Sequence, residues 1–279
     1  MLIDTHCHLN FNAFKNDTDE VIKRAHRAGV TCIINLGSQW DTSERAVKLA
    51  QEHDNLYAAI GLHPIHLFEQ EVDEEEIYFK TRAEVFNPSR YSALARGSGS
   101  KVVAIGECGL DYYRFPDGVD KTEVKTKQQE LFRQHITLAD ELNLPVIIHC
   151  REAYDDLLMI LKQELDKGRL SKKGVAHCFL GTQEQAKQFL DLGFLLSFTG
   201  IITFKNASPG LLKVVKETPI DRIMVETDAP YLAPQAYRGT RNEPAYIVEV
   251  AKKIAELKNI SLDELARVTT QNARNLFSL

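Results

Sequence analysis

The chain has 279 residues, of which 44 % are hydrophobic and 26 % charged, a composition typical of soluble globular proteins. With 34 Lys+Arg against 39 Asp+Glu, its net charge of -5 excludes a polybasic nucleic-acid binder, so any nucleic acid must meet a local basic rim. The sequence shows no apolar run long enough to span a membrane and no secretory signal, and its five cysteines are an odd number. We therefore expect a reduced, cytoplasmic protein without a disulfide framework or a membrane partner.

Short β-branched runs recur along the chain and predict eight strands. They are Leu2–Thr5, Val30–Leu36, Leu56–Gly61, Val102–Gly106, Val146–His149, Gly174–His177, Phe194–Phe198 and Arg222–Thr227. Helix-like stretches separate most of them, and this alternation indicates an α/β fold with a parallel sheet. Eight such units without a linker predict a single (β/α)8 TIM barrel. A doubly wound open sheet is the alternative, but its usual glycine-rich phosphate loop does not follow the first strand.

Capping residues mark where several helices begin and end. The segments Asp17–Glu20 and Ser261–Glu264 have the pattern of capping boxes. A helix over 182–192 would end at Gly193, and apolar spacing predicts another over Gln128–Leu142. These signals agree with the helices that a barrel requires between its strands.

The domain organisation follows from the spacing of the strands. We expect one barrel domain over 1–279, because nothing in the sequence resembles a linker. The spacing widens once, between the third and fourth strands, and predicts an insertion at the barrel rim over 66–101. An extended loop is also expected after Asp111, reaching Lys127.

Two histidines stand where the first strand should end. His6 and His8 point the same way, together with Asp4, because side chains alternate along a strand. Further candidate ligands stand at the ends of other strands: Glu107, His149, His177 and Asp228. Barrel enzymes carry their active sites at the carboxyl ends of the strands, so this coincidence predicts a metal site there.

The negative charge expected inside the predicted barrel also favours a metal site. Alternation also points Asp4, Glu107, Glu226 and Asp228 inward. Two carboxylates about 4 Å apart repel by about 4 kcal/mol at an effective dielectric near 20, so the group needs cations or protons. Imidazole and carboxylate ligands suit Zn²⁺, Mn²⁺ or Mg²⁺. Six ligands exceed the need of one catalytic ion, and two divalent metal ions bridged by Glu107 fit better.

Several residues near the expected mouth are candidates for substrate binding. His63 ends the third strand and faces the same opening, so we expect it to contact substrate. The basic residues expected there are Arg151, Lys205, Arg238 and Arg241. Arginine binds phosphate oxygens in a bidentate way, so Arg151 and Arg238 suit a phosphodiester substrate.

The remaining cysteines and histidines have simpler interpretations. Cysteines adjoin four of the proposed ligands: Cys7, Cys108, Cys150 and Cys178. Alternation turns them away from the site, and we expect them to be buried packing residues. His135 falls on the apolar side of a helix and is expected in the core, while His66 is expected in a loop.

Seven motifs in order resemble the TatD family of metal-dependent deoxyribonucleases, within the amidohydrolase superfamily. They are Ile3–His8, Gly61–Pro64, Gly106–Asp111, Pro145–Arg151, His177–Phe179, Glu226–Pro230 and Arg241–Pro244. The resemblance runs from residue 3 to about residue 277.

The resemblance carries expectations about the site and the activity. It implies metal ligands at His6, His8, Glu107, His149, His177 and Asp228. It also implies that Asp228 takes a proton from the attacking water, which with Glu107 makes the catalytic pair. Asp4 and Glu226 would hold the ligands in place by hydrogen bonds. The implied activity is 3′→5′ exonuclease cleavage of DNA.

Two other functions remain open from the sequence. The same barrel can hydrolyse esters or amides, and the family resemblance extends to RNA cleavage and to removal of D-amino acids from tRNA. The substrate could therefore be RNA or aminoacyl-tRNA instead of DNA, as for a D-aminoacyl-tRNA deacylase. The third possibility is a binding protein without catalysis, against which the complete ligand set argues.

Overall fold

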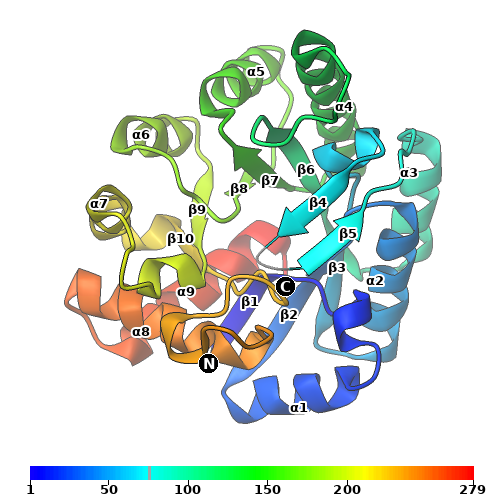
Figure 1. The fold of residues 1–279 in the computed structure, drawn as a ribbon. Coiled ribbons are helices and arrows are strands. Elements are labelled where there is room, and N and C mark those ends of the chain that lie inside the picture. Colours follow the sequence, from blue (N-terminus) through cyan, green and yellow to red (C-terminus); the bar gives the residue numbers. More distant parts are fainter. Residues whose placement is uncertain (75–76) are drawn as a thin grey trace.

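The fold is known from a computed structural model, and the structure describes residues 1–74 and 77–279 (Figure 1). Eight strands form one sheet: β1 (Leu2–Cys7), β2 (Val30–Leu36), β3 (Leu56–Ile60), β6 (Val102–Asp111), β7 (Val146–Arg151), β8 (Gly174–Ala176), β9 (Leu195–Phe198) and β10 (Ile223–Val225). Neighbours in the sheet follow chain order and pair in parallel. All eight expected strands are therefore present.

The first and last strands close the sheet into a barrel. Cys7 and Ala229 form a parallel bridge between them. The Asp228 amide donates to the His6 carbonyl at 2.8 Å, and the His8 amide donates to the Ala229 carbonyl at 2.8 Å. This confirms the predicted TIM barrel and excludes the open sheet.

Helices surround the barrel, and the last one lies behind it in Figure 1. They are α1 (Thr18–Arg27), α2 (Trp40–Glu52), α3 (Pro88–Gly97), α4 (Lys121–Leu142), α5 (Tyr154–Asp166), α6 (Gln183–Asp191), α7 (Pro209–Glu217), α8 (Ile247–Lys258) and α9 (Leu262–Phe277). One buried cluster combines side chains from all eight strands with Ala273 and Phe277 of α9. The last helix therefore contributes to the same core as the strands, and the side chains on the other face of the sheet pack against the helices.

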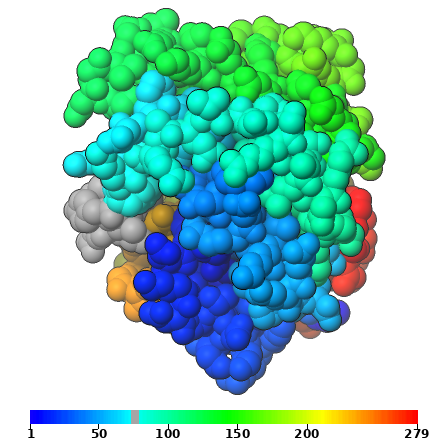
Figure 2. All heavy atoms as spheres, turned by 90° about the vertical axis from the view of Figure 1, so that its right-hand side faces the viewer, coloured from blue at the N-terminus to red at the C-terminus, as the bar shows by residue number. Residues whose placement is uncertain are grey.

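The segment 66–101, predicted as a rim insertion, contains two features. A hairpin of β4 (Glu71–Glu74) and β5 (Ile77–Lys80) lies over the β2–β3–β6 side of the barrel, and α3 follows it. In Figure 2, this part of the chain covers the surface beside α2. Thr81 anchors the hairpin, because its hydroxyl donates to the Phe68 carbonyl at 2.7 Å and its amide donates to Gln70 at 2.8 Å.

Two of the predicted helix starts need correction. The loop expected after Asp111 ends earlier than Lys127, because α4 begins at Lys121 with Asp120 accepting hydrogen bonds from its first turn. Asp17 precedes α1 but makes no side-chain capping bond; its carboxylate accepts from Arg241 instead, at 2.7 Å. The Ser261 cap of α9 is as predicted and accepts from the Glu264 amide at 3.1 Å.

Candidate active site

The closing seam of the barrel brings together two histidines and an aspartate. His6 and His8 leave the end of β1, and Asp228 follows β10. The Nε2 atoms of the two histidines lie 3.2 Å apart, and Asp228 Oδ1 lies 3.5 Å from His6 Nε2 and 3.4 Å from His8 Nε2. Three potential ligand atoms therefore converge on one point.

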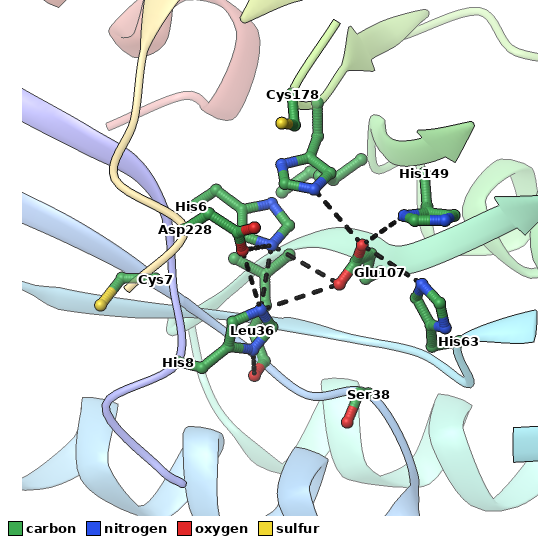
Figure 3. A network of polar contacts seen from close by, with 12 residues as sticks. His6, Cys7, His8, Leu36, Ser38, His63, Glu107, His149, Cys178 and Asp228 are labelled. Atoms are coloured by element: carbon green, nitrogen blue, oxygen red, sulfur yellow. Dashed lines mark hydrogen bonds and ion pairs between the residues drawn. The ribbon is translucent and has the colours of Figure 1, made fainter. Parts of the chain in front are cut away.

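Glu107 of β6 stands at the centre of the site (Figure 3). Its Oε2 lies 3.5 Å from His6 Nε2 and 3.8 Å from His8 Nε2. Its Oε1 lies 3.0 Å from His149 Nδ1 and 3.4 Å from His177 Nε2. The structure thus gathers all six sequence-predicted ligands, with Glu107 between two groups of them.

His63 joins the same cluster from the segment after β3. Its Nε2 lies 3.5 Å from Glu107 Oε1, and its Nδ1 accepts a hydrogen bond from the Ile65 amide at 3.3 Å. His63, Glu107 and His149 form a further group whose ligand atoms lie close enough to hold an ion.

The hydrogen bonds behind the ring nitrogens fit a metal site. His8 Nδ1 lies 3.1 Å from the Leu36 carbonyl, and His177 Nδ1 lies 2.9 Å from Glu226 Oε1. Each Nδ1 can therefore carry the proton, which leaves the lone pair of Nε2 directed at the cluster, as metal-binding histidines require. This donor set of imidazoles and carboxylates fits one or more divalent cations.

The backbone around the site is shaped for these positions. Asp228 has φ of 58° and Cys178 has φ of 43°, so both are non-glycine residues in the left-handed region, which is strained and concentrates at functional sites. Gly106 precedes Glu107, and a Cβ there would lie 2.7 Å from the Ile147 carbonyl oxygen. Only glycine allows β6 to approach β7 this closely.

Asp4 and Glu226 support the site in different ways. Asp4 accepts from the Thr227 hydroxyl at 2.6 Å and the Thr227 amide at 2.9 Å, and its Oδ1 lies 3.3 Å from the His6 amide. It therefore lies at the seam and not among the ligands, because the pairing register of β1 shifts after Asp4 and interrupts the expected alternation. Glu226 holds His177 and also accepts from the Cys178 amide at 2.6 Å.

Burial and neighbouring charges set the protonation of the cluster. Burial favours the neutral carboxyl of Glu107, but His63 and His6 hold its pKa well below its usual range. Burial also favours the neutral carboxyl of Asp228, but His177 lowers its pKa below the usual value. Burial disfavours the charged form of His177, yet Glu226 and Asp228 raise its pKa to about 10. The neighbouring imidazoles thus favour the ionised form of Glu107 and Asp228, as a cation would also do.

One residue of the site was missed by the sequence analysis. Asp111 Oδ2 lies 3.1 Å from His149 Nε2, so His149 lies between the carboxylates of Glu107 and Asp111. Burial opposes the ionisation of Asp111, but His149 lowers its pKa to about 2. The signal was present: Asp111 follows Glu107 by an even number of residues, and β6 continues to Asp111 instead of ending at Gly106.

A pocket opens above Glu107, and the predicted substrate residues lie differently around it. His63 and Arg151 line it, and the Arg151 guanidinium lies 3.9 Å from the Tyr113 ring centre. Arg238 lies outside this lining, with its guanidinium 4.4 Å from the centre of the Phe204 ring. Arg241 is bound to Asp17, so it serves to attach the segment after β10 to α1.

The expectations for cysteines and the other histidines are partly corrected. All five cysteines are free thiols, and Cys7 and Cys108 are buried away from the pocket as expected. Cys150 and Cys178 line the pocket instead, because they follow ligands at the very ends of strands. His135 is buried in α4 as predicted, whereas His66 lies in a buried 3-10 helical turn and lines the pocket.

Comparison with known proteins agrees with this geometry. The family model of TatD-related DNases matches residues 3–278. The chain belongs to the TatD family. An uncharacterized metal-dependent hydrolase of Bacillus subtilis, YabD, is 43 % identical over all of both chains. The 3′-5′ ssDNA/RNA exonuclease TatD of Pantoea ananatis is 34 % identical over all of both chains.

A solved relative shows the same fold. The crystal structure of the TatD homologue YjjV of Escherichia coli superposes with a TM-score of 0.85, at 34 % identity, covering 100 % of this chain and 98 % of that one. This TatD-family chain is thus a metal-dependent hydrolase. Among the described residues, no helix is long and apolar enough to cross a membrane.

Proposed function

We propose that this TatD-family protein is a 3′→5′ exonuclease that hydrolyses phosphodiester bonds of single-stranded DNA. The observation that carries the proposal is the convergence of five candidate imidazole and carboxylate ligands around a sixth, Glu107, at the base of a pocket that arginines also line. The named activity of the Pantoea relative supports the substrate and the direction.

The six candidate ligands would hold two divalent cations. His6, His8 and Asp228 would hold one, His149 and His177 the other, and Glu107 would bridge them. Mg²⁺, Mn²⁺ and Zn²⁺ all suit this donor set. When bound, such cations lower the pKa of water and stabilise negative charge on the entering and leaving oxygens.

The residues of the chain then position the substrate and move the proton. Arg151 and His63 line the pocket and would orient the terminal phosphodiester for in-line attack by water on phosphorus. The bond from phosphorus to the 3′ oxygen of the preceding nucleotide breaks, and a 5′-mononucleotide leaves. Asp228, held ionised beside His177 and His8, accepts the proton of the attacking water.

The experiment is release of mononucleotides from a 3′-labelled single-stranded DNA. We would compare Mg²⁺, Mn²⁺ and EDTA, beside a folded Glu107→Ala variant that controls for contaminating nucleases. The proposal expects labelled mononucleotide as the first product, only with metal and only with Glu107. Absence of release from protein shown to contain metal would overturn the exonuclease and direct attention to ester and amide substrates.

A further inference from the structure

The pocket above Glu107 has two unlike walls. Among the described residues, four lysine and arginine side chains line it: three lie in the segments that follow β2, β3 and β6, and the fourth ends β7. We call Arg45, Lys80, Arg114 and Arg151 the basic arc. Because strand order in the barrel follows chain order, these segments form one continuous half of the rim.

The other half of the rim carries most of the large apolar side chains of the lining. The segments that follow β8, β9, β10 and β1 supply what we call the apolar arc: Phe11, Leu180, Ile201, Tyr231 and Leu232. Among the described residues that line the pocket, this half contains neither lysine nor arginine. The lysine and arginine residues of the lining are therefore confined to one half of the rim, although Ile65 and Phe79 add apolar surface to that half as well.

Leu180 shows that the apolar arc is available to a ligand. Its residue surface is 49 % exposed, although it is a large apolar side chain at the opening of a pocket. The Leu180 amide donates to the Tyr154 hydroxyl at 2.9 Å, which fixes the backbone there. Binding is favoured when an apolar face of a ligand covers exposed apolar surface beside a site.

We propose that the pocket binds a single polynucleotide strand with its phosphates along the basic arc and its bases against the apolar arc. This inference rests on the proposed function and adds the orientation of the substrate. Phosphates carry the negative charge that the basic arc requires, whereas every base offers an apolar face regardless of its identity. Binding by this arrangement is therefore tolerant of sequence.

Two residues of the basic arc, Arg45 and Lys80, have exposed ion pairs that leave room for phosphate, whereas Arg114 lies 3.7 Å from the buried carboxylate of Asp111. Arg45 Nη2 lies 3.9 Å from Asp41 Oδ2 on the same helix, and Lys80 pairs with Glu69. Arg45 and Lys80 have side chains 46 % and 61 % exposed. Exposed pairs of this kind contribute at most about 1 kcal/mol, so a phosphate can replace the carboxylate at little cost.

The test measures binding, so it is independent of turnover. The probe is an oligothymidylate of about 12 nucleotides labelled at its 5′ end, within the usual reach of one binding groove. Two altered probes carry neutral methylphosphonate linkages or abasic sugars near the 3′ end. Fluorescence anisotropy follows each titration with metal-loaded Asp228→Asn protein, in which hydrolysis should be too slow to shorten the probe, and a gel confirms that the probe stays intact. All variants for this test are made in that background, which serves as the parent protein.

Each arc is tested with a matched control. Arg45→Ala is compared with Lys48→Ala, which removes a 77 % exposed cation from the same helix but outside the pocket lining. Leu180→Ala is compared with Met159→Ala, a 45 % exposed apolar residue on α5 that also lies outside it. Both controls should bind all three probes as the parent protein does.

The two arcs should respond to different probes. Arg45→Ala should weaken binding of the natural probe about 3- to 10-fold and lower its salt slope by about 0.7, with little change for the methylphosphonate probe. Leu180→Ala should weaken the natural probe by a similar factor, with little change for the abasic probe.

Equal losses on all three probes, or none, would overturn the proposal. If the discrimination is found but metal-loaded protein releases no mononucleotide, the binding mode stands and the nuclease fails. If mononucleotide is released but the probes do not discriminate, the nuclease stands and the two-sided pocket fails.

Discussion

Glu107 separates two halves of the candidate site that are built in different ways. On one side, His6 and Asp228 belong to the strands that close the barrel, and the Asp228 amide donates to the His6 carbonyl at 2.8 Å. On the other side, His149 is placed by the carboxylates of Glu107 and Asp111, at 3.0 and 3.1 Å.

The comparison teaches that the positions of the candidate ligands depend on the closure of the barrel on one side of the site more than on the other. On the seam side, the main chain that carries the ligands also closes the barrel. On the β7 side, side-chain hydrogen bonds do the positioning. Changes on the seam side should therefore affect both folding and activity, and changes on the other side should affect the site alone.

The largest effect is expected at Asp228 itself. Asp228→Asn keeps a residue that tolerates the left-handed backbone but removes the proton acceptor and a charged ligand. We expect the hydrolysis rate to fall about 10³-fold or more, measured as initial rates on a phosphodiester substrate. A rate within tenfold of the parent would remove Asp228 from the mechanism.

The next effect tests the opposite half of the site. Asp111→Asn removes the charge that holds His149, so metal affinity should fall about 10- to 100-fold while the fold is kept. Calorimetric titration with Mn²⁺ measures the affinity, and excess metal should restore most activity. Asp156→Asn is the control, because its carboxylate pairs with Tyr112 and Gln129 outside the pocket. Equal affinities of Asp111→Asn and the parent would contradict the positioning role.

Thr227→Val tests whether the seam is a structural joint. It removes the 2.6 Å hydrogen bond to the buried Asp4 carboxylate, which should destabilise the fold by about 2 kcal/mol. Urea unfolding of the apoprotein measures this free energy without a contribution from metal binding. Thr126→Val, on the exposed face of α4, should change little. A stable Thr227→Val protein would show that the seam tolerates loss of this bond.

The smallest effect concerns the support beneath His63. His135 Nε2 accepts from the Leu62 amide at 3.0 Å, and burial lowers its pKa to about 4. In the unfolded chain this histidine has a pKa near 6.5. Between pH 4 and 6.5 the unfolded chain therefore binds more protons than the folded protein, so the free energy of unfolding falls as the pH drops below about 6.5. This group should contribute a loss of about 1 kcal/mol by pH 5.5, measured by urea unfolding.

The variant His135→Gln isolates that contribution. At pH 7.5 it should be less stable than the parent, because the substitution removes buried hydrogen bonds of His135. Its stability should also fall less as the pH is lowered. An unchanged dependence of stability on pH in this variant would assign the acid sensitivity to other groups.

The sequence was sufficient to predict the barrel and to predict that the candidate ligands lie close together. Strand propensity and chemistry at the strand ends are local properties, so His6, Glu107 and His177 could be placed without coordinates. Asp4 was oriented wrongly because a register shift in β1 breaks strict alternation. Such a shift depends on pairing with a neighbouring strand.

The features that could not be predicted depend on contacts between segments that lie far apart in the sequence. Asp17 caps no helix because Arg241, far along the chain, takes its carboxylate. Asp111 was missed because pairing with β7 extends β6 beyond its β-branched core. The two-sided lining of the pocket depends on which loops meet at one rim, which no single segment encodes.

The closing seam has a consequence for synthesis of the chain. His6 is synthesised well before its partner Asp228, which lies 222 residues further along the chain. At about 5 to 20 residues per second, that interval is roughly 10 to 45 s. During it β1 lacks the strand that closes the barrel, and the candidate cation site lacks Asp228. The full set of candidate ligands therefore exists only after Asp228 has been synthesised.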